Sequence, residues 1–290
     1  MKKISCPRCY SANVIKNGKG HTNEQYYKCK DCFHHFREDI PNGAKVLIFD
    51  IENAPVEAYA WNRRLWNTNI SPDQIIKDWF MLTWCAKWLN DCDVMKEAVT
   101  PREAKKRDDT RIVKRLWKLF DEADIVVAHN AFKFDIPMVN TRFITLGLKP
   151  PSPYRIVDTL RVGKKIGAFT YNHLDYYGKV LGLSRKKHAD FQLWIDCVAG
   201  DEKALQVMLD YNVQDVLLLE EVYLMFRGWM KGHPNMNLFQ KEDGCSNCGS
   251  LKIHVKGSYA TQCNVYRTWQ CEDCGAYSRE TKKSKVSIAS

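Results

Sequence analysis

The 290-residue sequence has no long hydrophobic run. Its longest apolar stretches, such as Val46–Phe49 and Val216–Leu219, are a few residues long, whereas a membrane-spanning helix needs about 20. The basic N-terminus, Met1–Ser5, has no apolar core behind it, so we expect no signal peptide. These absences favour a cytoplasmic protein, of a bacterium or a phage-infected host, that has no membrane partner.

The sequence is short of acidic charge. It has 34 Asp and Glu against 44 Lys and Arg, a net charge of +10, which suits a polyanionic partner such as nucleic acid. The excess is concentrated at the two ends, with +4 in residues 1–44 and +3 in residues 241–290. Hydrophobic residues at 45% and charged residues at 27% are ordinary globular usage, which excludes a wholly disordered chain.

Twelve cysteines without a secretory signal indicate metal binding rather than disulfides. Two Cys-x-x-Cys pairs lie near each end of the sequence, and each set of four thiolates matches the ligands of a structural Zn²⁺. A redox dithiol would occur once, at a helix start in an α/β domain, so it fits less well. We therefore predict two zinc ribbons, with ligands Cys6, Cys9, Cys29 and Cys32 in the first and Cys245, Cys248, Cys271 and Cys274 in the second.

Aromatic and basic residues are interleaved in both ribbons. Rings among cations can stack bases and follow phosphates, so the ribbons are candidates to grip nucleic acid. The same rings would serve equally as the small core of each ribbon or as a docking surface for a protein, and both interpretations stay open. The rings are Tyr10, Tyr26, Tyr27, Phe33 and Phe36 in the first ribbon, and Tyr259, Tyr266, Trp269 and Tyr277 in the second.

The first ribbon is similar to the zinc ribbon of insertion-sequence transposases. The similarity lies in Cys6-Pro-Arg-Cys9, in Ile15-Lys-Asn-Gly-Lys19 and in Tyr27-Lys-Cys-Lys-Asp-Cys32. It implies contact with DNA rather than catalysis.

The middle of the chain alternates strand and helix patterns, which predicts an α/β domain with a mixed, largely parallel sheet. We expect strands at 46–51, 80–89, 94–98, 125–128 and 156–157, and helices at 109–120, 134–146, from 158, at 171–181 and at 201–229. The domain boundaries follow: 1–43 for the first ribbon, 44–236 for the α/β domain, 237–280 for the second ribbon and 281–290 for a basic flexible tail.

Acidic residues end two predicted elements and recur on a helix. Asp50 and Glu52 close the first strand of the α/β domain on one face, which is costly unless a cation satisfies them. Asp135 begins a helix just after a buried strand, and Tyr211 and Asp215 share one helix face at i, i+4 spacing. Four carboxylates in such positions can surround two Mg²⁺ or Mn²⁺ ions, the arrangement used for displacement at phosphorus.

Three motifs in order resemble the DEDD, or DnaQ-like, 3′–5′ exonuclease superfamily. They are Asp50-x-Glu52, then Asn130-x-x-x-Phe134-Asp135, then Tyr211-x-x-x-Asp215, and the tyrosine is typical of the DEDDy branch. Residues 45–230 are similar to the exonuclease domain of family B DNA polymerases. The resemblance implies a ribonuclease H-like fold and a two-metal exonuclease that releases 5′-mononucleotides from the 3′ end of DNA, single-stranded or frayed.

The resemblance also implies roles for the five residues. Asp50 would bridge both metals, Glu52 and Asp215 would complete the site near the first, and Asp135 would hold the second directly or through water. Tyr211 would orient the attacking water, because a phenol with a pKa near 10 is a poor base at pH 7.

Further residues have two interpretations each. Asn130 either contacts the 3′-terminal nucleotide or shapes its turn, and Asp158 is expected to cap the helix that follows. Basic residues beside the predicted site either bind phosphates of the substrate or form a solvated face: Arg161, Lys164, Lys165, Arg185, Lys186 and Lys187.

No polymerase follows the predicted exonuclease, so we expect it to act alone or in trans on a replication or repair partner. Alternative functions are an exoribonuclease or oligonucleotide trimmer of the same fold, and a nucleic-acid-binding zinc-ribbon protein whose acidic site is vestigial. Choosing between DNA and RNA needs contacts to the 2′-hydroxyl that a sequence does not show.

Overall fold

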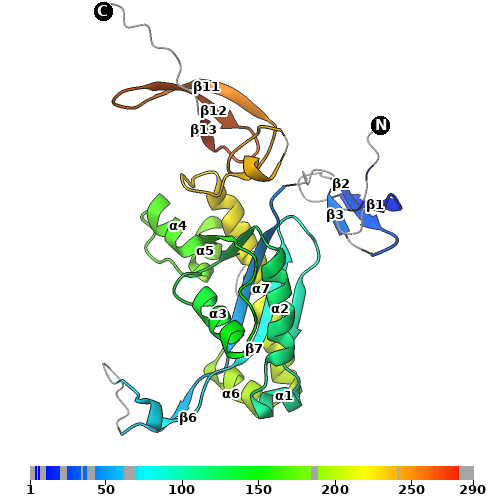
Figure 1. The fold of residues 1–290 in the computed structure, drawn as a ribbon, viewed down its shortest axis with the longest axis vertical. Coiled ribbons are helices and arrows are strands. Elements are labelled where there is room, and N and C mark those ends of the chain that lie inside the picture. The colour runs from blue at the N-terminus through cyan, green and yellow to red at the C-terminus, as the bar shows by residue number, and fades with distance from the viewer. Residues whose placement is uncertain are drawn as a thin grey trace, which may run out of the picture.

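The structure is a computed structural model of the chain (Figure 1). It describes residues 4, 6, 11–19, 25–33, 35–37, 43–61, 69–183, 189–240 and 242–280. The predicted tail 281–290 lies outside the described residues. Among the described helices, none has the length and apolar character that crossing a membrane would require.

A five-stranded sheet forms the centre of the molecule. Its strands are β4 (Val46–Asn53), β7 (Met81–Trp88), β8 (Met95–Ala98), β9 (Ile125–Ala128) and β10 (Arg155–Asp158), in the order β10-β9-β4-β7-β8. The β10–β9 and β9–β4 pairs are parallel, and the β4–β7 and β7–β8 pairs are antiparallel. The predicted mixed sheet is confirmed, but the expected parallel majority is wrong because half of the pairs are antiparallel.

The antiparallel pairing of β7 with β8 has a local cause. A short turn joins β7 to β8, and Asn90 adopts the left-handed conformation in it, with φ of 66°. Two strands joined by so short a connection can pair only in antiparallel orientation, because a parallel crossover needs a dozen or more residues. The helical crossovers are confined to the other side of β4, where β9 and β10 run parallel to it.

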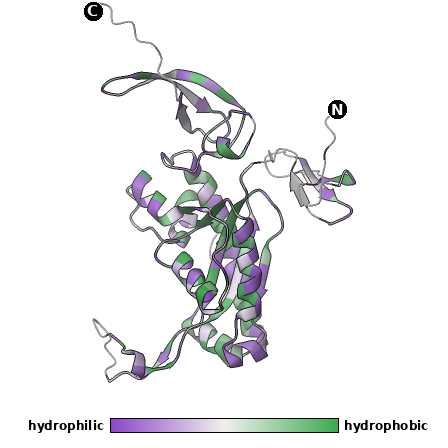
Figure 2. Ribbon diagram, in the orientation of Figure 1, coloured by the Kyte–Doolittle hydropathy of each residue, from purple (hydrophilic) through white to green (hydrophobic). Residues whose placement is uncertain are grey.

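Helices cover both faces of the sheet. They are α1 (Pro101–Lys106), α2 (Thr110–Glu122), α3 (Asp135–Thr145), α4 (Thr159–Ile166), α5 (Leu174–Leu181), α6 (Phe191–Ala199) and α7 (Glu202–Arg227). The apolar core on one face contains α2 and α3, and that on the other contains α5 and the second half of α7. The central strands are mostly green in Figure 2, as expected for a sheet buried between two layers.

The alternation of side chains along β4 decides where its carboxylates point. Leu47, Phe49 and Ile51 belong to the core on the α2 side, whereas Val46 and Ile48 belong to the core on the α7 side. Successive strand residues face opposite sides of a sheet, so Asp50 and Glu52 continue the row that faces α7.

Most predicted elements have counterparts within a few residues of the expected bounds. The helix predicted from residue 171 begins only at Leu174, because the side chain of Asn172 accepts a hydrogen bond from the Tyr177 hydroxyl and its carbonyl bonds His129. The helices α1 and α6 were missed. The Thr100–Glu103 capping box before α1 is a sequence signal that could have indicated it.

An arm between β4 and β7 was also missed. It contains β5 (Glu57–Ala58), a short 3₁₀ helix (Pro72–Gln74) and β6 (Ile75–Lys77), and it projects from the lower end of the molecule in Figure 1. Arg107 fixes its base through hydrogen bonds to Glu57 and to the carbonyls of Pro55 and Asp78.

Two small three-stranded sheets form the ends of the described chain. The first comprises β1 (Val14–Lys19), β2 (Gln25–Cys29) and β3 (His35–Arg37), and the second comprises β11 (Ile253–Ala260), β12 (Val265–Cys271) and β13 (Tyr277–Arg279). In the first sheet, β1 and β2 pair as an antiparallel hairpin.

The second ribbon docks on the C-terminal end of α7. The side-chain amide of Asn247 donates hydrogen bonds of 2.8 Å to the carbonyls of both Arg227 and Met230. At Gly228 a Cβ atom would lie 2.0 Å from the carbonyl oxygen of Cys274, so the ribbon approaches the helix too closely for any other residue. The ribbon is therefore packed against the helix that carries Tyr211 and Asp215.

We predict that Asn247→Ala loosens this docking. The change leaves two buried carbonyls without their donor, a cost of about 1–3 kcal/mol. Amide hydrogen exchange should accelerate in residues 242–280 and in the last turn of α7. Lys256→Ala, an exposed change on β11, is the control, and equal exchange in both variants would contradict the docking role.

A buried ion pair ties the α2 face of the sheet together. The Asp109 carboxylate accepts hydrogen bonds from the Met81 amide at 2.8 Å and from Arg142 Nε at 2.7 Å, so it joins β7, α2 and α3. The Asp109 side chain is fully buried and that of Arg142 is 17% exposed.

We predict that Asp109→Ala lowers the free energy of unfolding by about 3–5 kcal/mol, because it leaves the Arg142 guanidinium buried without its partner. Chemical denaturation measures the loss. Arg115→Ala breaks a pair with Glu97 in which the arginine is 57% exposed, and it should cost less than about 1 kcal/mol. Similar losses in the two variants would contradict a special role for the buried pair.

Candidate active site

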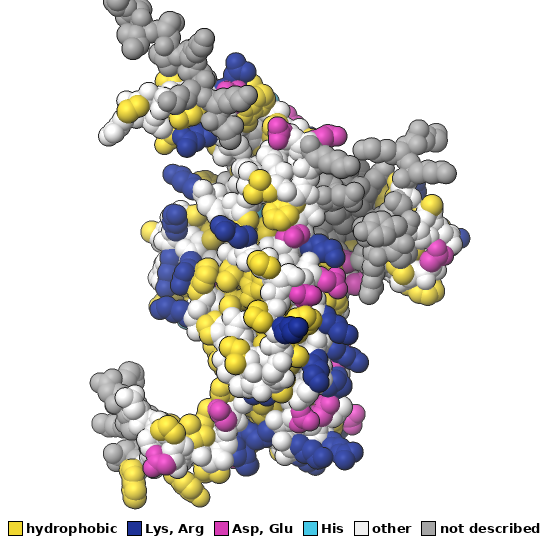
Figure 3. All heavy atoms as spheres, in the orientation of Figure 1, with side chains coloured by type: hydrophobic (Ala, Val, Ile, Leu, Met, Phe, Trp, Pro, Cys, Tyr) yellow, Lys and Arg dark blue, Asp and Glu magenta, His cyan; other side chains and the backbone are white. Residues whose placement is uncertain are grey.

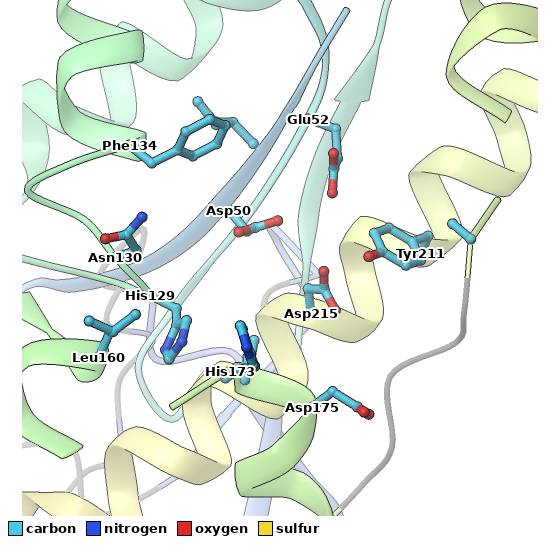
Figure 4. Close-up of a pocket in the computed structure, with 13 residues that line it drawn as sticks. Asp50, Glu52, His129, Asn130, Phe134, Leu160, His173, Asp175, Tyr211 and Asp215 are labelled. Atoms are coloured by element: carbon cyan, nitrogen blue, oxygen red, sulfur yellow. The ribbon is translucent and has the colours of Figure 1, made fainter. Parts of the chain in front are cut away.

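A pocket of about 760 Å³ opens at the C-terminal end of β4. Its residues come from β4, from the loop after β9 and from α4, α5 and α7 (Figure 4). The lining comprises Asp50, Ile51, Glu52, His129, Asn130, Phe134, Leu160, His173, Leu174, Asp175, Ala189, Tyr211 and Asp215. Four of the five residues predicted as catalytic are in this set; the fifth, Asp135, is not.

Three carboxylates meet in the pocket. Oxygen atoms of Asp50, Glu52 and Asp215 all lie within 4.8 Å of one another. Asp50 and Glu52 are half-buried, and Asp215 is only 2% exposed. Three like charges at this distance repel strongly where water is scarce, so the arrangement is suited to a bound cation.

Tyr211 stands one helical turn before Asp215 on the same face of α7. Its ring lies 6.3 Å from the ring of Trp194 in an edge-to-face contact, which helps to fix its direction. In Figure 4 its hydroxyl points toward the group formed by Asp50, Glu52 and Asp215.

Asp135 is the first residue of α3 and is 1% exposed. Neither of its carboxylate oxygens has a hydrogen-bond partner. Burial, with the negative charges of Asp158 and Glu52, raises the pKa of Asp135 to about 8. The carboxylate is near enough to Glu52 for this effect, although it is outside the group of three.

One carboxylate organises the loop beside the pocket. Asp158 accepts hydrogen bonds from the amides of Asn130 at 3.1 Å and Phe132 at 3.3 Å, and from those of Leu160 and Arg161 in the first turn of α4. The predicted capping role of Asp158 is thus confirmed. Asn130 has a left-handed φ of 69° and also lines the pocket, so turn shaping and ligand contact are compatible at this residue.

His129 has two fixed contacts. Its ring nitrogens lie 2.9 Å from the Thr159 hydroxyl and 2.9 Å from the Asn172 carbonyl. Both nitrogens are therefore engaged in joining the β9 loop to α4 and to the loop before α5.

Sequence reasoning missed two ionisable residues of the pocket. His173 and Asp175 stand at the start of α5 and are exposed. His173 stacks on Tyr171, with ring centroids 6.4 Å apart and planes at 25°. No motif in the surrounding sequence marks these two residues as part of a site. They reach the pocket because the loop between α4 and α5 folds back to it.

The structure describes only some of the basic residues that were considered for phosphate binding. Lys164 and Lys165 are exposed in the last turn of α4. Arg185, Lys186 and Lys187 fall outside the described residues, as does Cys9 of the first ribbon.

The cysteines of both ribbons converge as expected for metal sites. Sulfur atoms of Cys245, Cys248, Cys271 and Cys274 lie within 4.8 Å of one another, as do those of Cys6, Cys29 and Cys32. Pairs of sulfurs are 3.5–3.6 Å apart, too long for a disulfide and close to the edge of a Zn–S tetrahedron. Hydrogen bonds from Cys248 and Cys274 hold the pKa of Cys245 well below its usual range.

The described part of the second ribbon is slightly acidic, although the sequence segment 241–290 that contains it is basic. The described residues 242–280 contain four Lys and Arg and five Asp and Glu, so the positive excess of residues 241–290 lies in Lys241 and the tail. Cys263 is exposed in a turn, and His254 faces Glu272 on the ribbon surface, so neither joins the thiolates.

Three comparisons with known proteins bear on this chain. Residues 88–226 match a family model described as the RNase_H superfamily, and residues 2–33 match the InsA N-terminal domain, a zinc ribbon. The first match begins after β4, so it includes Asp135, Tyr211 and Asp215 but not Asp50 or Glu52. A search of curated proteins gave no match.

Among solved structures, the chain is similar to the family B DNA polymerase from the hyperthermophilic archaeon Pyrobaculum calidifontis. The identity is 16% and the TM-score 0.43, and the alignment covers 74% of this chain and 29% of the polymerase chain. The family matches and the cysteine clusters together identify an RNase H superfamily domain with an InsA-type zinc ribbon before it and a second cysteine cluster that fits a zinc ribbon after it.

Proposed function

We propose that the chain is a metal-dependent 3′–5′ exonuclease of the DEDDy type that acts on DNA. The observation that carries the proposal is the convergence of Asp50, Glu52 and Asp215 within 4.8 Å in an open pocket, with Tyr211 beside them. The RNase H superfamily match in residues 88–226 supports phosphodiester chemistry at this place.

The donor set fits divalent cations. Carboxylate oxygens are the ligands that Mg²⁺ and Mn²⁺ prefer, and three of them already surround one space. The buried carboxylate of Asp135, whose oxygens have no hydrogen-bond partner, is a further ligand of the same kind near Glu52. Asp50, Glu52 and Asp215 would hold the first ion, and Asp50 and Asp135 the second.

Other residues of the pocket would orient the attacking water and bind the substrate. Bound cations acidify water and stabilise charge on the leaving oxygen of a phosphodiester. Tyr211 orients the attacking water through its hydroxyl, which Trp194 and the α7 backbone hold in place. Asp158 holds the backbone amide of Asn130, and the side-chain amide of Asn130 faces the terminal nucleotide. Phe134 and Leu160 supply apolar surface in the pocket for the sugar or base of that nucleotide.

The ribbons are proposed to carry one structural Zn²⁺ each. The first matches the InsA-type zinc ribbon and resembles the ribbon of insertion-sequence transposases, so it is the better candidate to bind nucleic acid. The second has no positive excess among its described residues and is packed on α7, which favours a bracing role over a grip.

We predict that Asp215→Asn and Asp50→Asn each reduce cleavage of 5′-labelled single-stranded DNA by at least about 1,000-fold in Mg²⁺ or Mn²⁺, because the cation site loses a ligand. A denaturing gel should show a ladder that shortens from the 3′ end with wild-type protein. Matched RNA in parallel ranks the two substrates.

Asp210→Asn is the matched control, since this exposed residue lies on the same helix and undergoes the same change. It should cleave at the wild-type rate. Shortening from the 5′ end, or an Asp215→Asn protein within tenfold of wild type, would overturn the proposed function. A salt-sensitive shift on a native gel without cleavage would favour a binding protein with a vestigial site.

We predict that Asp135→Asn stabilises the metal-free protein at pH 8. The folded protein keeps the Asp135 proton up to a pKa of about 8, whereas the unfolded chain releases it near pH 4. Stability is therefore lost as pH rises through this window, and asparagine does not suffer that loss. Each kcal/mol regained raises Tm by about 2–4 °C in a domain of this size.

The measurement is thermal unfolding in EDTA at pH 5 and pH 8, with Asp210→Asn as the control. The gain should be larger at pH 8, and added Mn²⁺ should raise the Tm of wild type more than that of the variant. A gain that does not depend on pH would show that the buried charge is not its source.

A further inference from the structure

Phe132 and Arg161 form an ordered pair at the rim of the pocket. The Arg161 guanidinium carbon lies 4.0 Å from the centre of the Phe132 ring, which places the cation directly over the ring face. Phe132 is 40% exposed and the Arg161 side chain 56% exposed, so the pair faces solvent.

The pair is held by the same carboxylate that shapes the pocket wall. Asp158 accepts the Phe132 amide at 3.3 Å, and its Oδ2 lies 3.8 Å from Arg161 Nε. Asp158 is 3% exposed, so this anchor is buried. An arginine that has a carboxylate near its Nε and a ring against one face keeps its terminal N–H groups and its other face available.

The pair adjoins the lining of the pocket without belonging to it. Asn130 and Phe134 on one side, and Leu160 on the other, line the pocket, while Phe132 and Arg161 lie just outside. This rim is therefore one of the edges over which a strand with its last nucleotide in the pocket can leave.

Positive charge continues from the pair along α4. Arg161, Lys164 and Lys165 have i, i+3, i+4 spacing, which puts them on one helix face, and all three are exposed. The helix sequence Thr-Leu-Arg-Val-Gly-Lys-Lys-Ile contains no acidic residue. In Figure 3, several Lys and Arg side chains line the edge of the core where Figure 1 places α4 and α5.

From these positions we infer that the Arg161–Phe132 pair is a binding site for the phosphodiester backbone of a single strand just before its 3′-terminal nucleotide, and that α4 carries the strand away from the pocket. The inference rests on the proposed function for the identity of the ligand. It assigns Arg161 and Phe132 to substrate binding, not to chemistry. Arg161 donates to phosphate, and the guanidinium plane held on Phe132 offers a stacking face to a base.

The test begins with binding to fluorescein-labelled oligo-dT in EDTA over a range of salt. Arg161→Ala should weaken binding about tenfold and lower the salt slope by about 0.7, the value for one phosphate contact on a single strand. Arg161→Lys should keep the slope but lose part of the affinity, because the planar contact with Phe132 is lost. Phe132→Leu should weaken binding with the slope unchanged.

Arg102→Ala is the matched control, an exposed arginine on α1 at the opposite end of the core from α4 in Figure 1. The second readout is a ratio of two kcat/KM values measured with Mn²⁺. The first value is for the oligonucleotide, and the second is for the p-nitrophenyl ester of thymidine 5′-phosphate, which has no upstream phosphates. Arg161→Ala should lower this ratio about tenfold, mainly through KM for the oligonucleotide.

The outcomes separate the inference from the proposed function. Arg161→Ala that binds and cleaves as Arg102→Ala does would overturn the inference and leave the exonuclease intact. Wild-type protein that cleaves neither substrate, but binds with an Arg161-dependent slope, would overturn the exonuclease and support the binding site. A ratio that stays constant while both activities fall would show that Arg161 acts on the pocket itself, which also overturns the inference.

Discussion

The mutual repulsion of carboxylates packed between β4 and α7 is the constraint on which the site depends. Asp50, Glu52 and Asp215 lie within 4.8 Å of one another, and Asp135 is buried nearby with neither oxygen hydrogen-bonded. Such a group is unfavourable in the bare protein, so the rest of the fold must hold it together. The apolar rows of β4 and the long helix α7 supply that support through the core that they share.

The surrounding network makes this support rigid. Asp109 joins β7, α2 and α3 on one face of the sheet, while Lys87 of β7 pairs with Glu220 of α7 on the other, with both side chains largely buried. Buried pairs of this kind add less to net stability than apolar packing, but an ion buried without its partner is costly, so the pairs disfavour arrangements that separate the elements that they connect. The position of α7 against β4, and hence the spacing of the carboxylates, is set in this way.

Features that are encoded by residues close together in the sequence were predicted correctly, and features that depend on distant parts of the chain were not. The apolar run of β4, each Cys-x-x-Cys pair and the Asp158 cap are encoded within a few residues. The strand, the two sulfur clusters and the cap follow that local pattern. The site residues His173 and Asp175 were not predictable, because a loop far along the chain brings them to the pocket. The antiparallel pairing of β7 with β4 could not be predicted from its sequence. A continuous apolar run indicates a buried strand but does not indicate the direction in which the strand pairs.

The second ribbon shows that the charge of a sequence segment can differ from the charge of the part that folds. Its segment is basic in the sequence, which favoured a grip on nucleic acid, yet its described residues carry one more acidic than basic side chain. Its contacts include the end of α7, where the Asn247 side chain donates hydrogen bonds to two carbonyls and Gly228 lies against the Cys274 backbone. Since a metal-bound ribbon is far more rigid than a metal-free one, zinc there would fix the end of the helix that carries Tyr211 and Asp215. The ordered cations near the pocket, Arg161 foremost, are then better placed than the ribbon to hold a strand.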